Sequence, residues 1–388
     1  MTEENYMERA IELAKRGRGY VNPNPLVGAV IVKDGRIIGE GYHAKYGDLH
    51  AERDALKNVT ESPEGATIYV TLEPCCHHGK QPPCTDAIIE SGIKRVVIGS
   101  ADPNPVVNGH GVKILRDAGI EVIEGFMKKE CDALNPVFMH YITTGRPYVM
   151  MKYAMTADGK IAAKTGASRY VSGEESRYEV QKLRHELKGI MVGIGTVLMD
   201  DPKLTCRIEG GINPVRIVCD SRLRTPSVSY IAETASEIPT IILSAVRELK
   251  TGEITEEDVK TSGSETAIRG ERLLQKGVRI FNYPLKDEAR VDLHEAMKAL
   301  GKAGIDGILL EGGGTLNESM LREGLVQEIR MFLSPKIFGG KAKTPVEGIG
   351  VEDPKDAQLF TWKDVQIVGK DLMVTAVPQE GDTCLQES

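Results

Sequence analysis

The chain has 388 residues, more than one domain usually needs, so two or three domains are expected. Its formal net charge of -7 gives no long-range attraction for nucleic acid or for an anionic membrane. The start of the chain lacks a secretory signal, and the most apolar window, residues 189–199, is too short to span a bilayer, so a cytoplasmic protein is expected. Seven cysteines, an odd number in so long a chain, favour reduced thiols or metal ligands over a disulfide framework.

The first 125 residues alternate between helix and strand signals. Apolar residues at helical spacing predict a helix over 6–16. An apolar run over 26–32 predicts a strand, which Asp34-Gly35 would turn into a second strand over 37–42. The elements expected next are a helix over 50–57, a strand over 67–71, a helix over 85–91, a strand over 95–99, a helix over 112–118 and a strand over 121–123. Strands separated by helices after an initial hairpin predict a mixed sheet covered on both faces.

A helical stretch over 127–141 ends at Thr143-Thr144-Gly145-Arg146-Pro147, a typical linker composition, so domains over 1–145 and 146–388 are expected. A second alternating series follows. Its expected elements are a strand over 148–154, a helix over 172–187, strands over 189–193 and 215–219, a helix over 293–303, a strand over 307–310, a helix from 315, and strands over 328–333 and 372–377. The polar segment 247–272 has little apolar periodicity and is predicted to be a solvated excursion.

Three residues with metal-ligand chemistry stand at the ends of predicted elements. His50 begins a predicted helix, Cys75 follows a predicted strand, and Cys84 precedes another predicted helix. One imidazole and two thiolates leave a fourth tetrahedral position for water, which is the arrangement of a catalytic zinc site. Glu52 can reach that water and move protons without binding the metal.

A purely structural zinc site would be closed by a fourth protein ligand. Cys76, His77 and His78, in the loop between the two cysteine ligands, are the residues that could close it. The sequence leaves this alternative open.

The metal motif resembles the zinc deaminases of nucleobases, in which His-x-Glu is followed by two cysteines. The eight residues between Cys75 and Cys84, in place of the usual two, resemble the expanded loop of the riboflavin-biosynthesis deaminases. Asn22-Pro23-Asn24-Pro25-Leu26-Val27-Gly28 is similar to the substrate loop of that family. The resemblance implies a cytidine-deaminase-like three-layer α/β domain. It also implies substrate contacts from Asn24, His43, Lys80 and Asn104.

In the second half, residues 309–317 have the pattern of a strand, a glycine turn and a helix. Such a turn lets backbone N–H groups and a helix N-terminus approach a phosphate, although it is also common in purely structural loops. It is not the dinucleotide-binding G-x-G-x-x-G pattern. Residues 152–162, 172–177, 193–197 and 200–207 resemble the riboflavin-type reductases, which implies a dihydrofolate-reductase-like domain.

Carried over residue by residue, this second resemblance implies two sets of contacts. The NADPH contacts would be Ala154, Tyr170, Thr196, Asp200, Ser221, Gly313 and Gly314. The substrate contacts would be Ser168, Arg184, Leu204, Arg207 and Glu311. The two arginines suit a sugar phosphate because a guanidinium donates paired hydrogen bonds, although surface salt bridges would also explain them. Tyr170 stands where the family usually has Trp, so an aromatic face is retained.

Together the resemblances imply a bifunctional riboflavin-biosynthesis enzyme that uses Zn²⁺ and NADPH. It would deaminate 2,5-diamino-6-ribosylamino-pyrimidinone 5′-phosphate and then reduce the ribosyl side chain to ribityl. A small pyrimidine nucleotide is the expected partner, with no nucleic acid and no membrane, and a homo-oligomer is expected. One alternative is a nucleic-acid base deaminase with an accessory domain, against which the acidic balance and the lack of an aromatic and basic stripe argue. The other is a protein that binds zinc and a dinucleotide without turnover.

Overall fold

The structure is a computed structural model that describes residues 1–78, 81–104, 107–168, 170–262, 264–286 and 288–379. It divides the chain into two compact units, Met1–Gly145 and Arg146–Ser388. Within the described residues, no helix combines the length and the apolar character needed to cross a bilayer.

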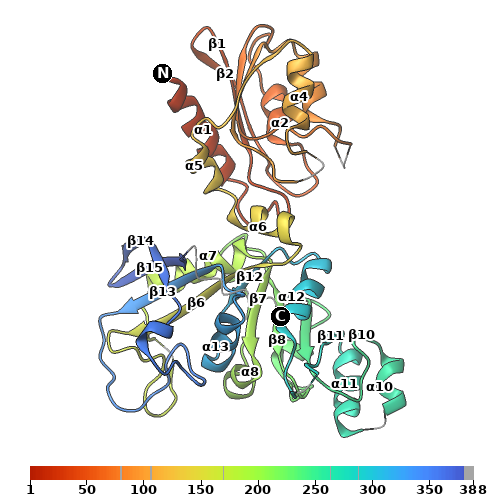
Figure 1. Ribbon diagram of the computed structural model, residues 1–388, viewed down its shortest axis with the longest axis vertical. Helices are drawn as coiled ribbons and strands as arrows, with labels where there is room; N and C mark the ends of the chain where they lie inside the picture. Colours follow the sequence, from red (N-terminus) through yellow and green to blue (C-terminus); the bar gives the residue numbers. More distant parts are fainter. Residues whose placement is uncertain (79–80, 105–106, 169, 263, 287, 380–388) are drawn as a thin grey trace. The chain divides into compact units, whose positions relative to one another are not determined.

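The first unit is built on a five-stranded sheet in the order β2-β1-β3-β4-β5 (Figure 1). Its strands are β1 (Gly28–Lys33), β2 (Arg36–Tyr42), β3 (Thr67–Leu72), β4 (Arg95–Ser100) and β5 (Glu121–Ile123). β1 pairs antiparallel with β2 and β3, whereas β3, β4 and β5 are parallel. The predicted mixed sheet and its opening hairpin are therefore confirmed, with Asp34 and Gly35 at φ 49° and 73° in the turn.

Helices cover both faces of this sheet (Figure 1). They are α1 (Glu3–Lys15), α2 (Ala51–Lys57), α3 (Cys84–Glu90), α4 (His110–Asp117), α5 (Lys128–Asp132) and α6 (Pro136–Thr144). Alternate strand residues separate two cores: Val30 packs with α1 and α5, and Ile31 packs with α2, α3 and α4. The predicted single helix over 127–141 is wrong, because Asn135 caps α6 and Pro136 cannot continue α5.

The second unit contains a ten-stranded sheet in the order β10-β11-β9-β8-β7-β12-β6-β13-β15-β14 (Figure 1). Its strands are β6 (Tyr148–Thr156), β7 (Gly189–Gly193), β8 (Val215–Cys219), β9 (Thr240–Ser244), β10 (Gly252–Ile254), β11 (Arg279–Asn282), β12 (Gly307–Leu310), β13 (Glu328–Ser334), β14 (Phe360–Val368) and β15 (Asp371–Pro378). The central strands from β11 to β13 are parallel, and the outer ones pair antiparallel. The carboxyl ends of the central strands therefore meet at one edge, where open α/β sheets bind ligands.

The helices of this unit are α7 (Glu174–Glu186), α8 (Ile194–Asp200), α9 (Tyr230–Glu233), α10 (Glu256–Ser262), α11 (Glu265–Gln275), α12 (Leu293–Lys302) and α13 (Gly314–Arg322), with a short 3₁₀ helix, η1 (Pro354–Asp356). α12 and α13 pack on one face of the sheet, while α8, α9, α10 and α11 pack on the other. Strands β9, β11 and β14 and helices α8 and α9 have no counterpart in the sequence predictions.

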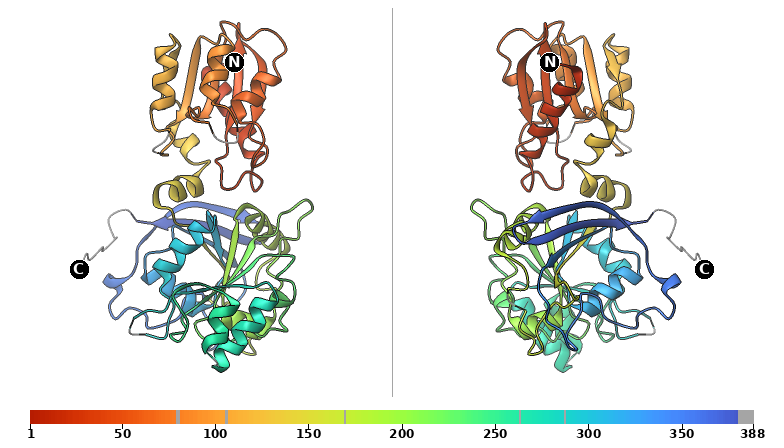
Figure 2. Two further views of the ribbon diagram at one scale, coloured as in Figure 1. Left: turned by 90° about the vertical axis from the view of Figure 1, so that its right-hand side faces the viewer. Right: turned by 90° about the vertical axis from the view of Figure 1, so that its left-hand side faces the viewer.

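The predicted solvated excursion over 247–272 is wrong. This segment forms β10, α10 and most of α11, and the two helices lie side by side (Figures 1 and 2). Leu249, Ile254, Val259 and Ala267 are each at most 5% exposed and belong to one core with the sheet. One apolar side chain per turn is enough for a helix that covers only the edge of a sheet, so the periodicity is too sparse to recognise.

Candidate active sites

The three predicted metal ligands of the first unit lie together. His50 is the N-cap of α2, Cys84 is the first residue of α3, and Cys75 follows the end of β3. His50 Nδ1 lies 3.4 Å from the sulfur of Cys75 and 3.4 Å from that of Cys84. Ligands around one tetrahedral zinc ion stand about 3.6 Å apart, given Zn–N and Zn–S bonds of about 2.1 and 2.3 Å. The donor set and its spacing therefore fit zinc.

Hydrogen bonds favour the thiolate form of Cys75, which is the form that binds a cation. The backbone N–H of Cys84 donates to the sulfur of Cys75 over 3.4 Å. The hydrogen bond from the Cys84 thiol, opposed by burial and assisted by His50, lowers the pKa of the Cys75 thiol. A thiolate is the form that binds a metal. Among the described residues, the cluster comprises only these three ligands, and Cys76, His77 and His78 are outside it.

Glu52 lies in the first turn of α2, two residues from His50, and is 3% exposed. Burial, reinforced by the negative charge of Cys75, raises the pKa of Glu52 to about 7. A carboxyl group with a pKa near neutrality can both accept and donate a proton. The position and the chemistry of Glu52 suit a proton carrier beside the metal site.

The predicted substrate residues Asn24 and His43 contact each other beside the metal cluster. His43 Nδ1 lies 2.9 Å from the carbonyl oxygen of Leu49, which can only accept, so Nδ1 carries the proton. Burial lowers the pKa of His43, which favours the neutral ring. Its Nε2 then accepts a hydrogen bond from Asn24 Nδ2 over 3.1 Å. The ring of His43 lies edge-on to that of His50, with centroids 5.5 Å apart.

A residue that the sequence analysis did not name fixes the loop that carries Asn24. The buried side chain of Asn135 accepts from the backbone N–H of Leu26 over 2.7 Å and donates to its carbonyl oxygen over 2.9 Å. The sequence pattern Asn135-Pro136 indicates that Asn135 caps a helix. It does not indicate that Asn135 contacts a residue 109 positions away.

Asn104 follows β4, whose end lies beside the end of β3 that leads to Cys75. Its backbone N–H donates to the carboxylate of Asp102 over 2.9 Å. Burial raises the pKa of Asp102 to about 6. Glu73, also not anticipated, accepts from the N–H groups of Gly109 and Val112 at the start of α4, over 3.1 and 3.3 Å. These bonds fix the chain just before Cys75. Lys80 lies outside the described residues.

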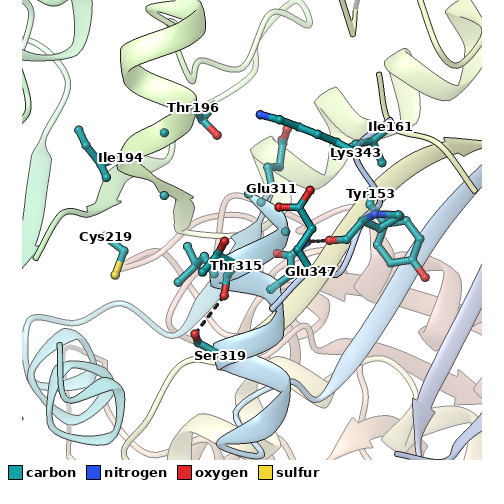
Figure 3. A pocket seen from close by; sticks show the side chains of 18 of the residues that line it. Tyr153, Ile161, Ile194, Thr196, Cys219, Glu311, Thr315, Ser319, Lys343 and Glu347 are labelled. Carbon is teal, nitrogen blue, oxygen red and sulfur yellow. Dashed lines mark hydrogen bonds between the residues drawn. The ribbon is translucent and has the colours of Figure 1, made fainter. Parts of the chain in front are cut away.

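The second unit contains a cavity of about 1530 Å³ at the carboxyl ends of β6, β7, β8 and β12. Figure 3 shows Thr196, Cys219, Glu311 and Glu347 around it. The predicted cofactor residues that line it are Ala154, Tyr170, Thr196, Asp200, Ser221, Gly313 and Gly314. The predicted substrate residues that line it are Ser168, Arg207 and Glu311. The cavity therefore brings together most of the residues that the second resemblance implied.

Arg184 and Leu204 do not line this cavity. Arg184, on α7, donates two hydrogen bonds to the carboxylate of Glu311, over 2.7 and 2.9 Å. Burial raises the pKa of Glu311, but the charges of Arg184 and Lys152 outweigh it and lower that pKa to about 2. Leu204 is 4% exposed and packs in the core.

Lys152, on β6, lines the cavity but was not singled out from the sequence. Burial lowers its pKa, and the charge of Glu311 opposes that change. Tyr170, in contrast, is 66% exposed, and the guanidinium of Arg177 lies 5.2 Å from the centre of its ring. An aromatic face is thus present at the rim of the cavity.

The glycine turn after β12 has the expected geometry. Gly312 and Gly313 have φ values of 105° and 94°, which only glycine adopts readily. Gly313 is the N-cap of α13 and offers no side chain to the first N–H groups, which suits an anionic ligand. Gly314 also makes room for Glu347, because a Cβ atom at Gly314 would stand 2.5 Å from Cγ of Glu347.

The chain is similar to known proteins over nearly its whole length. Residues 147–374 match the RibD C-terminal domain, and residues 1–100 match the cytidine and deoxycytidylate deaminase zinc-binding region. The chain is 49% identical over 378 residues to the riboflavin biosynthesis protein RibD of Actinobacillus pleuropneumoniae, covering 97% of this chain and 96% of that protein. It is 38% identical over 390 residues to RibD of Escherichia coli strain K12, and the match covers 97% of this chain and 100% of that protein.

A solved structure is similar to both units. It is a diaminohydroxyphosphoribosylaminopyrimidine deaminase/5-amino-6-(5-phosphoribosylamino)uracil reductase from Thermotoga maritima, with a TM-score of 0.81 and 39% identity. The match covers 97% of this chain and 98% of that one.

Proposed function

Because this chain belongs to the RibD family of riboflavin-biosynthesis proteins, we propose that Met1–Gly145 deaminates 2,5-diamino-6-ribosylamino-pyrimidinone 5′-phosphate and that Arg146–Ser388 reduces the ribosyl side chain of the product. The chain is a bifunctional enzyme, a hydrolase and an oxidoreductase, that uses zinc and NADPH. Its fold is the expected one, a cytidine-deaminase-like α/β domain followed by a dihydrofolate-reductase-like domain.

The observation that carries the deaminase assignment is the position of Glu52 beside the cluster of His50, Cys75 and Cys84. When bound by these residues, zinc activates a water molecule for attack at neutral pH. Glu52 takes the proton that this water loses and delivers it to the departing amino group, so that ammonia is released. Its raised pKa supports both transfers.

We assign recognition of the pyrimidine to the residues around the metal cluster. Asn24 presents an amide that can hydrogen-bond the edge of the ring, and His43 orients that amide through their 3.1 Å contact. Asn104 contributes from the end of β4. Lys80 is the candidate for the phosphate.

In the second unit, the cavity would hold the dinucleotide and the ribosyl side chain together. When bound there, NADPH would supply the hydride for the open-chain carbonyl or imine carbon of that side chain, and solvent would supply the proton. Ser168, Arg207 and Glu311 bind the substrate, since all three line the cavity that also contains the cofactor residues. Arg184 acts through Glu311 and fixes its carboxylate. Much of the catalysis then comes from the relative position of hydride donor and acceptor.

The proposed partners are small molecules and a second copy of the chain, in the cytoplasm, with no nucleic acid. Edge strand β14 supports the homo-oligomer, because Trp362, Val365 and Ile367 on it are 62%, 58% and 79% exposed. Exposed apolar side chains on an unpaired strand edge are typical of an interface.

The test is a reaction of the purified chain with the diaminopyrimidinone nucleotide and NADPH, in which ammonia and NADPH are measured together. Ammonia release should come first, followed by an equal amount of NADPH oxidation. Deamination of an oligonucleotide but not of the free nucleotide, or binding of zinc and NADPH without turnover, would contradict the proposal.

A further inference from the structure

Two arginines lie on one turn at the end of β8. Arg222 and Arg224 both line the cavity and are exposed, and Leu223 between them is completely buried with φ 48°. The carboxylate of Asp220 accepts hydrogen bonds from the backbone N–H and the hydroxyl of Thr225, over 2.7 and 2.8 Å. The turn is thus anchored on both sides of the arginines, which project from a fixed backbone.

The cavity extends across the sheet, from β6 at one end to β8 at the other. Going from β6 through β12 and β7 to β8 crosses three strand spacings, or about 14 Å at about 4.8 Å each. Lys152 on β6 and Glu311 after β12 lie at one end, and the charge of Arg207 acts on Glu311. The hydride must be transferred at that end, where the substrate residues are.

A dinucleotide whose nicotinamide lies at the substrate end extends from there towards β8. Its pyrophosphate would pass the glycine turn at Gly313, the N-cap of α13, and its adenosine would reach Ser221 and the arginine turn. The rest of the inference depends on the proposed reductase function, since that function supplies the dinucleotide.

Among the described residues, no carboxylate oxygen lies closer than 4.0 Å to the guanidinium group of Arg222 or Arg224, in contrast to Arg290 and Arg322 in the same cavity. Within the part of the chain that the structure describes, the guanidinium of Arg222 has no hydrogen bond or ion pair, and the nearest carboxylate oxygen to Arg224 is that of Asp220 at 4.0 Å. Arg322 instead pairs with Glu318 at 2.7 Å, and Arg290 pairs with Glu288 at 2.7 Å. One guanidinium group without an ion pair and one with only a long ion pair suit a phosphate dianion.

We propose that Arg222 and Arg224 bind the 2′-phosphate on the adenosine ribose of NADPH and thereby set the preference for NADPH over NADH. NADH has a hydroxyl group at that position. The arginines therefore determine the specificity of the reduction without contacting the reacting atoms.

The test is equilibrium binding to the full-length chain, measured by titration with NADPH, NADH, 2′,5′-ADP and 5′-AMP. The variants are Arg222→Ala, Arg224→Ala and the double replacement, with Arg222→Lys and Arg224→Lys as conservative versions and Arg322→Ala as the matched control. Each single alanine variant should bind NADPH and 2′,5′-ADP about 10-fold more weakly than wild type. The double variant should bind them about 100-fold more weakly, as expected for the loss of charge-assisted hydrogen bonds. The affinity for NADH and for 5′-AMP should change by less than about 3-fold. The lysine variants should bind NADPH more tightly than the alanine variants but less tightly than wild type.

Equal losses for NADPH and NADH, or an unchanged ratio between them in the double variant, would overturn the assignment to the arginines. If the wild-type chain nevertheless binds NADPH more tightly than NADH, the proposed reductase function still holds. If wild-type chain binds neither dinucleotide, the reductase function and this assignment both fail. Circular dichroism of each variant, and retained binding of NADH, separate loss of the subsite from misfolding of the second unit.

Discussion

Arg184 and Glu311, which the sequence assigned separately to the substrate, bind each other through two hydrogen bonds of 2.7 and 2.9 Å. Their side chains are only 11% and 13% exposed. Arg184 also donates to the carbonyl oxygen of Thr205 over 2.9 Å. A buried pair of this kind costs about 3–5 kcal/mol when one partner is removed, because the other charge is left buried.

The pair should make the stability of the second unit depend on pH. The pKa of Glu311 is lowered to about 2 in the folded chain, against about 4.3 when unfolded. Its contribution, on the order of 3 kcal/mol, is therefore complete above about pH 4.3 and is lost as the pH falls towards 2. We expect Glu311→Gln to be less stable than wild type at pH 7, by an amount that shrinks by pH 3.

Urea unfolding followed by the fluorescence of Trp362, the one tryptophan of the chain, measures this difference in the second unit. Glu288→Gln is the control, because the pair of Glu288 with Arg290 is 52% exposed on both sides and should contribute less than about 1 kcal/mol. A stability loss for Glu311→Gln that is constant from pH 7 to pH 3 would contradict the role of the charge.

Cys75→Ser should remove zinc and deamination together and leave NADPH-dependent reduction of the deaminated substrate unchanged. The cluster has three ligands, so loss of one should weaken zinc binding by more than the roughly 10–100-fold typical of an outer partner. Zinc content by atomic absorption and the two separate activities provide the measurement. Cys76→Ser, at the next residue and outside the cluster, should keep its zinc and its deaminase activity. If this variant releases zinc, the site has a fourth protein ligand.

Gly314→Ala should destabilise the chain because its Cβ would stand 2.5 Å from Cγ and 2.8 Å from Cδ of Glu347. We expect a loss of about 1–3 kcal/mol. In a Glu347→Ala background the cost should shrink, because Cγ and Cδ of Glu347 are removed and only its Cβ, 3.0 Å from the added Cβ atom, remains close. Urea unfolding of the double-mutant cycle measures the coupling. Gly195→Ala, with open space at its Cβ, should be nearly neutral. Equal costs in both backgrounds would refute the contact.

The exposed face of β14 should mediate self-association. Ile367, 79% exposed on this edge strand, is the most sensitive position, and Ile367→Lys should shift the chain towards the monomer. Sedimentation velocity over a range of concentrations measures the shift, and Lys363→Arg on the same strand is the control. A wild-type chain that is monomeric at all concentrations would refute the interface.

The metal site was predictable because its chemistry depends on residue type and short spacing. His50 and Glu52 are two residues apart, and Cys75 and Cys84 stand at the ends of recognisable elements. The hairpin and the parallel strands were predictable for the same reason, since turn residues and apolar runs are local signals.

Contacts between distant residues had no such signal. Arg184 and Glu311 are 127 residues apart, so each could be matched to a family position but not to the other. Glu347 lies in a loop without a motif and contacts Gly314 only because the fold brings that loop to α13. The buried residues of α11, Ala267, Gly270 and Leu273, recur at helical spacing, but two of the three are small, so the apolar signal in the sequence was weak.

The central claim, that two separate sites in one chain act in sequence, is tested most directly by Glu52→Gln. With the diaminopyrimidinone nucleotide, this variant should retain zinc and lose both ammonia release and NADPH oxidation, each by at least about 100-fold. With the deaminated uracil nucleotide supplied instead, it should oxidise NADPH at the wild-type rate. If NADPH oxidation stays lost with the deaminated substrate, or if ammonia release survives the replacement, the two-site account is contradicted.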